Sequence, residues 1–271
     1  MEHGVSSEAC ADAPDEVAWL ADEPRSVTDG ILGTADAAGH GAALIDASDG
    51  SVTAWPRLAY TIRTAACGLA CRGVAAGDTV GVFVRDAASF AIAVNAIRAA
   101  GAAAAMIGPG TPVADVAGRL DSCGARLLIT SAALAAQATD AADRSRVRQV
   151  IAFGDAAETT PFSSLLGRPG RPGQDLRTGP APWPGTAPAD GMADGGQAFT
   201  RRDIVITAPP CGDEAAYTAL LDRALLAGAT LVAAPLPLVT AALRVYQGTA
   251  AIVPAGTQIP GLGAGRVHHI A

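Results

Sequence analysis

The spacing of apolar residues between positions 53 and 130 alternates between a helical period and short continuous runs. Thr53 is the expected N-cap of the first helix, Pro56 falls in its first turn, where a missing N–H costs little, and Gly73 is the expected stop. A spacing of three or four residues puts the apolar side chains on one helix face, which is typical of packing against a core. These apolar positions are Leu58, Ile62, Ala65 and Leu69.

Three apolar runs and two more helices complete this stretch. The runs lack polar alternation, which is typical of strands buried on both faces of a parallel sheet. Asp86 or Ser89 can cap the second helix, which stops at Gly101, and Pro112 opens a third helix that ends near Gly124. Strands that alternate with helices of about a dozen residues predict parallel pairing and right-handed crossovers. The expected strands are residues 79–84, 102–107 and 126–129.

The α/β alternation extends to both sides. Asp49-Gly50 between two short apolar runs predicts a hairpin. Ser131 is the expected cap of an alanine-rich helix, and a helix near the C-terminus is expected to carry Leu238, Ala242 and Val245. The other expected elements are strands at 42–46, 51–53, 147–153, 199–207, 230–234 and 250–253, and helices at 161–166, 214–227 and 237–246.

These elements predict an α/β protein with two parallel-sheet lobes flanked by helices. Residues 167–198 are rich in Pro and Gly and lack periodicity, so we expect a flexible linker there. The expected organisation is a disordered tail at 1–17, an N-terminal α/β lobe at 18–166, the linker at 167–198, a second, smaller α/β lobe at 199–258 and a flexible tail at 259–271.

At 271 residues, the chain is long enough for one large or two small domains. The net charge is −7 and the basic residues are scattered, which argues against nucleic acid or an anionic membrane as partner. No stretch approaches the roughly 20 apolar residues of a membrane helix, and the acidic N-terminus has no apolar segment of a signal peptide. We therefore expect a cytoplasmic protein with reduced thiols and no membrane insertion.

All 19 basic residues are arginines, so the sequence contains no lysine. Codon bias toward GC-rich codons is the simplest cause. Whatever the cause, the absence of lysine has a chemical consequence. Without a lysine there is no ammonium group for a phosphate loop, no Schiff base and no amine general base.

The order of these pieces resembles a known family. The pieces are T-x-x-x-L near a helix start (here with one extra residue), G-V-x-x-G-D-x-V-x-V, a helix ending in G-A, an apolar strand and C-G-A-R-L-L-I-T. Together they resemble the N-terminal region of the adenylate-forming superfamily, which holds acyl-CoA synthetases, coumarate-CoA-type ligases, luciferases and nonribosomal adenylation domains. The resemblance covers roughly residues 20–165 and 200–255.

The resemblance implies ATP- and Mg²⁺-dependent activation of a carboxylic acid, for which this family uses a phosphate loop such as T-S-G-T-T-G-x-P-K-G. Residues 167–198 stand in its place, and the fragments Gly185-Thr186 and Gly195-Gly196 lack its spacing. Where the family often has a histidine after the next strand, this chain has Cys211 and Gly212. The later family motifs Y-G-x-T-E and T-G-D are not found. The resemblance therefore carries over no catalytic, cofactor-binding or metal-binding residue, and no cofactor is expected.

Other candidate constellations have simpler interpretations. Cys67 and Cys71 are spaced for one helix face, where they are either a metal or redox pair or two small apolar residues facing the sheet. His268-His269 are either metal ligands or terminal, solvent-exposed side chains. The glycines of Gly261-Leu-Gly-Ala-Gly265 are misplaced for a dinucleotide loop, so a plain tail is expected. The acidic residues between Asp12 and Glu23 are most simply a solubilising tail.

Three functions remain open. The first is a truncated acyl-CoA synthetase-like protein that cannot adenylate an acid on its own, either a pseudoenzyme or a non-catalytic partner. The second is a working acid-activating ligase, dependent on ATP and Mg²⁺, that another chain completes. The third is an unrelated α/β binding module with the same topology. Lost segments would expose apolar faces on the second lobe, so we expect a protein partner or a homo-oligomer there.

Overall fold

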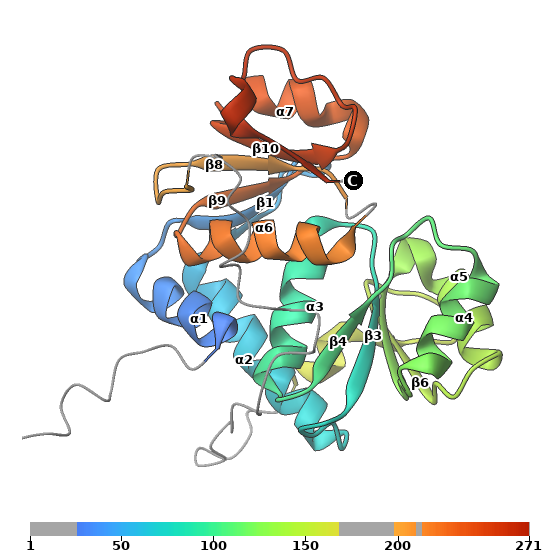
Figure 1. Ribbon diagram of the computed structural model, residues 1–271. Coiled ribbons are helices and arrows are strands. Elements are labelled where there is room, and N and C mark those ends of the chain that lie inside the picture. The colour runs from blue at the N-terminus through green and yellow to red at the C-terminus, as the bar shows by residue number, and fades with distance from the viewer. Residues whose placement is uncertain (1–25, 168–197, 210–212, 271) are drawn as a thin grey trace, which may run out of the picture.

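The structure is a computed structural model that describes residues 26–167, 198–209 and 213–270. Two β-sheets alternate with three layers of helices (Figure 1). The expected α/β fold with parallel sheets flanked by helices is confirmed. The tail at 1–17, and the linker at 167–198 apart from Gly167 and Ala198, lie outside the described residues.

The smaller sheet has the strand order β4-β3-β5-β6-β7, and all neighbouring strands are parallel. Successive side chains of its central strand β3 point alternately to the apolar clusters on the two faces of the sheet. Val80 and Val82 of β3 face the helices between the sheets, whereas Phe83 faces the outer helices. The strands are β3 (Thr79–Phe83), β4 (Ala103–Met106), β5 (Leu127–Ser131), β6 (Gln149–Phe153) and β7 (Thr160–Pro161).

The larger sheet has the order β11-β10-β8-β9-β1-β2. Only β1 and β2 are antiparallel among its described strands, and they form the hairpin expected around Asp49-Gly50, where Gly50 has a φ of 74°. The strands are β1 (Ala42–Asp46), β2 (Val52–Ala54), β8 (Ile204–Thr207), β9 (Thr230–Ala233), β10 (Ala250–Pro254) and β11 (Val267–Ile270).

The helices form an inner layer between the sheets and two outer layers (Figure 1). The inner layer comprises α1 (Val27–Ala37), α2 (Trp55–Cys71), α3 (Ala87–Ala99) and α6 (Glu214–Leu226). On the outer face of the smaller sheet lie α4 (Val113–Ser122) and α5 (Ala135–Asp143), and on that of the larger sheet lies α7 (Val239–Val245). Short 3₁₀ turns are η2 (Ala132–Leu134), η3 (Phe162–Leu165), η4 (Leu236–Leu238) and η5 (Ala264–Arg266).

The inner layer gives the two sheets one shared core. Apolar side chains of α2 and α3 pack in the same cluster as those of β3, β5, β8 and β9. The helical spacing that the sequence shows in α2 is confirmed, because Leu58, Ile62, Ala65 and Leu69 are all fully buried. Helices of the inner layer therefore share one apolar core with strands of both sheets.

The structure pairs strands across the expected division into lobes at 18–166 and 199–258. Strand β1 pairs with β9, so the hairpin of the first segment completes the sheet of the second. The expected tail at 259–271 also contains β11, which pairs in parallel with β10. Just before β11, the Arg266 guanidinium donates to the buried carboxylate of Asp203 at 3.1 Å, which ties this segment to the start of β8.

Two local predictions are wrong. Thr53 lies in β2, and Ala54 precedes the first turn of α2 instead. The Ser131 hydroxyl does not cap a helix but accepts from the backbone N–H of Arg85. Of the apolar residues expected on the helix near the C-terminus, Ala242 is buried, whereas Leu238 and Val245 are exposed, because α7 turns Val239, Ala242 and Leu243 toward the sheet.

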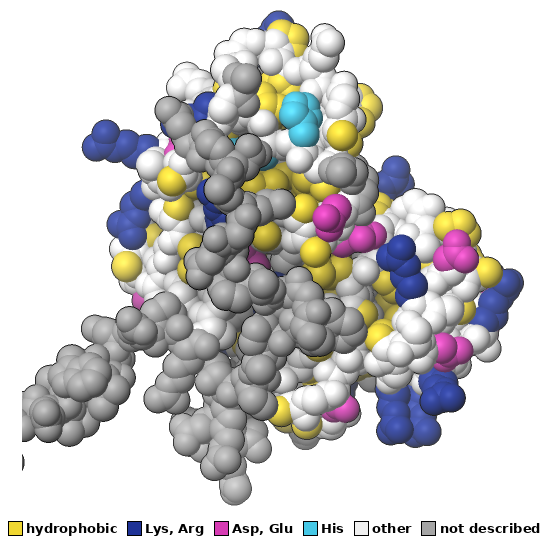
Figure 2. All heavy atoms as spheres, viewed as in Figure 1, with side chains coloured by type: hydrophobic (Ala, Val, Ile, Leu, Met, Phe, Trp, Pro, Cys, Tyr) yellow, Lys and Arg dark blue, Asp and Glu magenta, His cyan; other side chains and the backbone are white. Residues whose placement is uncertain are grey.

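None of the described helices is both long enough and apolar enough to cross a membrane. Basic side chains stand on several sides of the face shown in Figure 2, which agrees with their scattered positions in the sequence.

Candidate functional site

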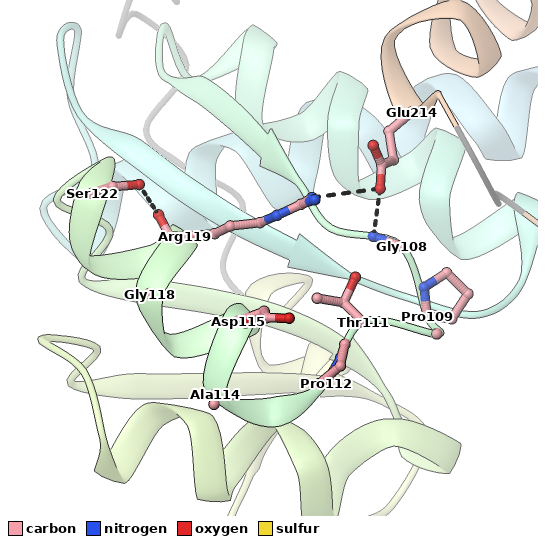
Figure 3. A pocket seen from close by; sticks show the side chains of 11 residues that line it. Gly108, Pro109, Thr111, Pro112, Ala114, Asp115, Gly118, Arg119, Ser122 and Glu214 are labelled. Atoms are coloured by element: carbon pink, nitrogen blue, oxygen red, sulfur yellow. Dashed lines mark hydrogen bonds and ion pairs between the residues drawn. The ribbon is translucent and has the colours of Figure 1, made fainter. Parts of the chain in front are cut away.

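An open hollow of about 700 Å³ lies between α4, the loop that joins β4 to α4, and the start of α6 (Figure 3). It is placed at the carboxyl end of β4, where open α/β sheets commonly bind ligands. Its lining joins segments about a hundred residues apart in the chain. The lining residues are Gly108, Pro109, Gly110, Thr111, Pro112, Ala114, Asp115, Gly118, Arg119, Ser122 and Glu214.

Glu214 connects the two sides of the hollow. Asp213 caps α6 by accepting from the backbone N–H groups of Ala215 and Ala216 at 2.9 and 3.0 Å, and this fixes Glu214 in the first turn. The Glu214 Oε1 atom accepts from the backbone N–H of Gly108 at 2.9 Å (Figure 3). A Cβ atom at position 108 would meet this oxygen at 2.9 Å, so a larger residue there would displace the Glu214 carboxylate.

Three charged side chains line the hollow, and two of them pair with each other. Arg119 Nη1 lies 3.6 Å from Glu214 Oε1, and the Arg119 side chain is 53% exposed, so this ion pair is weak. Asp115 adds a second carboxylate. Two carboxylates against one guanidinium give the lining side chains a net charge of −1. Such a lining repels a polyphosphate rather than holding it.

Tyr217 fixes the exit of β8 close to the hollow. Its ring meets Phe90 edge to face, with centroids 5.4 Å apart. Its hydroxyl donates to the carbonyl of Ala208 at 2.9 Å and lies 2.9 Å from Thr207 Oγ1. The sequence indicates Tyr217 only as an apolar helix residue, and no sequence signal marks its contact with the β8 backbone.

The candidate residues from the sequence do not gather at this hollow. Cys67 on α2 is half-buried and Cys71 is exposed, so the interpretation that both face the sheet is wrong for Cys71. His268 and His269 are neighbours in β11, so their side chains point to opposite faces and cannot share one metal. His268 packs against Phe199 with centroids 4.9 Å apart.

The remaining candidates fall into two groups. Gly261 to Gly263 lie before η5, and Ala264 and Gly265 belong to η5, which leads into β11. Cys211, Gly212, the fragments around Gly185 and Gly195, and the acidic stretch up to Glu23 lie outside the described residues. No group of three or more His, Cys, Asp or Glu residues within the described part of the chain could hold a metal ion.

The fold resembles part of several solved structures, among them CoA ligases. A long-chain-fatty-acid-CoA ligase from Archaeoglobus fulgidus shares 15% identity with a TM-score of 0.68, over 86% of this chain and 52% of that one. A benzoate CoA ligase from Burkholderia xenovorans LB400 shares 18% with a TM-score of 0.66, over 84% and 50%. MbtA of Mycobacterium smegmatis shares 22% with a TM-score of 0.65, over 86% and 49%.

Residues 34–189 match the family described as AMP-binding enzyme. This match covers more than half of the 271 residues, so the chain belongs to the AMP-binding enzyme family. No curated protein sequence matches the chain. The chain spans about half the length of the structures that it resembles.

Proposed function

We propose that this 271-residue chain keeps the scaffold of the AMP-binding family but does not by itself convert a carboxylic acid to an acyl adenylate. The observation that carries the proposal is the composition, because the sequence contains no lysine. Formation of an acyl adenylate develops negative charge on the transferring phosphate, which the resembled family meets with a phosphate loop that carries a lysine, and this chain has no lysine to supply that ammonium group.

The geometry supports the same proposal. In the hollow, the N–H of Gly108 and the guanidinium of Arg119 are the groups suited to bind an anion, and Glu214 engages both. A nucleotide there would have to displace an internal carboxylate and would still face Asp115. Both effects oppose the binding of ATP.

Pyrophosphate exchange tests the proposal. The isolated chain is assayed with ATP, Mg²⁺ and a panel of aliphatic, aromatic and amino acids, with a benzoate CoA ligase as the positive control. We expect exchange at background with every acid. Calorimetric titration with ATP–Mg²⁺ is expected to show no binding. Exchange above background with any acid, or saturable ATP binding by the isolated chain, contradicts the proposal.

The second candidate function is a ligase that another polypeptide completes. Exposed apolar side chains on the second lobe favour it, since Leu236 and Leu238 of η4 are each 44% exposed and Val245 of α7 is 73% exposed. Apolar side chains reach the surface over the α7 part of the molecule (Figure 2). This candidate predicts that the same exchange assay is positive for the complex purified from the native host and negative for the isolated chain.

A further inference from the structure

One face of α6 carries three polar side chains that contact the part of the chain belonging to the smaller sheet. Glu214, Thr218 and Asp222 are four residues apart, so they lie above one another along the helix. We call these three residues the α6 polar stripe. Glu214 binds the loop after β4 at Gly108, as described above.

The other two members of the stripe continue this line of contacts. The Thr218 hydroxyl oxygen lies 2.8 Å from Met106 Sδ at the end of β4. Asp222 Oδ2 accepts from Arg98 Nη1 at 2.8 Å, and Arg98 lies in the last turn of α3. Three consecutive turns of α6 therefore fix the helix of one sheet to β4 and α3 of the other.

Asp222, one of the two charged members of the stripe, lies in a narrow, dry seam between α3 and α6. Asp222 is 8% exposed as a residue, and the Arg98 side chain is 24% exposed. The seam has no space for a water molecule. It is lined by Phe90, Ala91, Val94, Asn95, Thr218, Leu221, Asp222 and Leu225. In such surroundings the loss of hydration opposes the attraction between the two charges.

Burial raises the pKa of Asp222 above its ordinary value, and the charge and hydrogen bond of Arg98 offset this only in part. From α3 the facing groups are Arg98 and the neutral Asn95, and β4 contributes the neutral Met106. On α1, Asp29 and Asp36 are the carboxylates, and the latter pairs with Arg63 of α2. Among the described residues, Arg98 is the charged group that acts on the pKa of Asp222.

We propose that the α6 polar stripe latches the two sheets together and that the charge on Asp222 sets how tightly the latch closes. A protonated Asp222 enters the seam with little loss of hydration. A charged Asp222 loses its hydration on closure, so an arrangement in which water reaches this end of α6 becomes more populated. Because Glu214 holds the start of the helix at Gly108, opening is expected at the Asp222 end.

The raised pKa of Asp222 determines how the stability of the closed latch changes with pH. The pKa of Asp222 is higher in the closed state than in an opened or unfolded state, so closure is favoured at low pH. This stabilisation is fully present below the ordinary pKa of about 3.9 and is lost as the pH rises through the higher pKa of the closed state. The latch is therefore looser at neutral than at acidic pH.

Amide hydrogen exchange of the full chain tests this proposal at several pH values between 4 and 8, after correction for intrinsic rates. In the unmodified chain we expect protection of residues 221–227 to fall by up to about tenfold per pH unit across the titration of Asp222. In Asp222→Asn we expect protection that is higher at pH 7 and independent of pH. Equal or lower protection at pH 7, or an unchanged pH dependence, overturns the proposal.

Two further measurements keep the test independent of a folding defect. Arg98→Met leaves Asp222 without its partner, so the fall in protection is expected at a higher pH than in the unmodified chain. Asp36→Asn is the matched control, because Arg63 holds the pKa of Asp36 below its ordinary value on the surface of α1. That control is expected to leave the exchange of residues 221–227 unchanged. A carboxyl NMR titration that finds an ordinary or lowered pKa for Asp222 also overturns the proposal.

Discussion

At the scale of single residues, two helical glycines have opposite environments. A Cβ atom on Gly68 of α2 would overlap the carbonyl oxygen of Leu165 and come within 2.8 Å of its Cα. Gly33 of α1 is exposed, and a Cβ atom there meets nothing within 4 Å. Gly68 is therefore required by the close approach of η3 to α2, whereas Gly33 is not required by packing.

These environments predict opposite effects of alanine. Gly68→Ala is expected to destabilise the protein by about 1–3 kcal/mol, because η3 must move away from α2. Gly33→Ala is expected to stabilise it by up to about 1 kcal/mol through helix propensity. Urea unfolding of both variants checks the prediction. Equal effects of the two substitutions would show that contact with Leu165 does not decide the cost.

The same scale shows where prediction of the candidate site stops. Asp213 and Glu214 are recognisable as a helix start, and Gly108 and Gly110 as a turn. Nothing local to either segment indicates that they meet, because 106 residues separate Glu214 from Gly108. The hydrogen bond between them depends on how the two sheets share the inner helices, which periodicity does not specify.

At the scale of elements, β11 depends on one buried carboxylate. Asp203 is 4% exposed and accepts from the hydroxyls of Thr249 and Thr200 at 2.7 and 2.8 Å, in addition to Arg266. Burial opposes the charge on Asp203, but these hydrogen bonds and Arg266 outweigh it and lower its pKa. The carboxylate thereby joins the start of β8, the start of β10 and the turn before β11.

Asp203→Asn is expected to reduce the free energy of unfolding by about 2 kcal/mol at pH 7, since bonds to a charged group are lost. The folded pKa is lowered, so the contribution of Asp203 is present above the unfolded pKa of about 3.9 and disappears as the pH falls through the folded value. The variant should therefore lose less stability than the unmodified chain between pH 5 and pH 2. Urea unfolding of Asp203→Asn and of the unmodified chain across this pH range measures the effect.

Hydrogen exchange tests the role of Arg266, with the exposed Arg244 as the control position. We expect Arg266→Met to weaken hydrogen-exchange protection of residues 267–270, and Arg244→Met to leave it unchanged. Equal loss in both arginine variants would mean that Asp203 does not hold β11.

Element identity follows well from the sequence, and rotation and pairing do not. The glycine stops after α2 and α3 are confirmed by positive φ values of 87° at Gly73 and 86° at Gly101. The Asp86 cap of α3 is confirmed as well, with a bond to the Ser89 N–H. In contrast, β11 follows a glycine-rich stretch without periodicity, so nothing local in the sequence predicts its pairing with β10.

At the scale of the whole molecule, the first and last thirds of the described chain are joined in one sheet. Thr230 Oγ1 donates to the carbonyl of Ala42 at 2.8 Å, and Thr34 Oγ1 donates to that of Leu226 at 3.0 Å. Together with the pairing of β1 with β9, these bonds connect α1 and β1 to α6 and β9.

Residues 1–180 and 181–271, produced as separate chains in one cell, are therefore expected to co-purify as a one-to-one complex. The first chain alone should aggregate, because the edge of β1 and the inner helices lose their apolar cover. Light scattering after size-exclusion chromatography checks both outcomes. Two folded species that elute separately would mean that the sheets are independent domains.

The pairing of β1 with β9 also sets an order of events during translation. Thr230 follows Ala42 by 188 residues, a distance that the ribosome covers in on the order of ten to forty seconds at usual elongation rates. Throughout that time the edge of β1 that later pairs with β9 has no neighbouring strand. The nascent chain therefore gives chaperones a defined interval to bind that edge, which closes when β9 emerges.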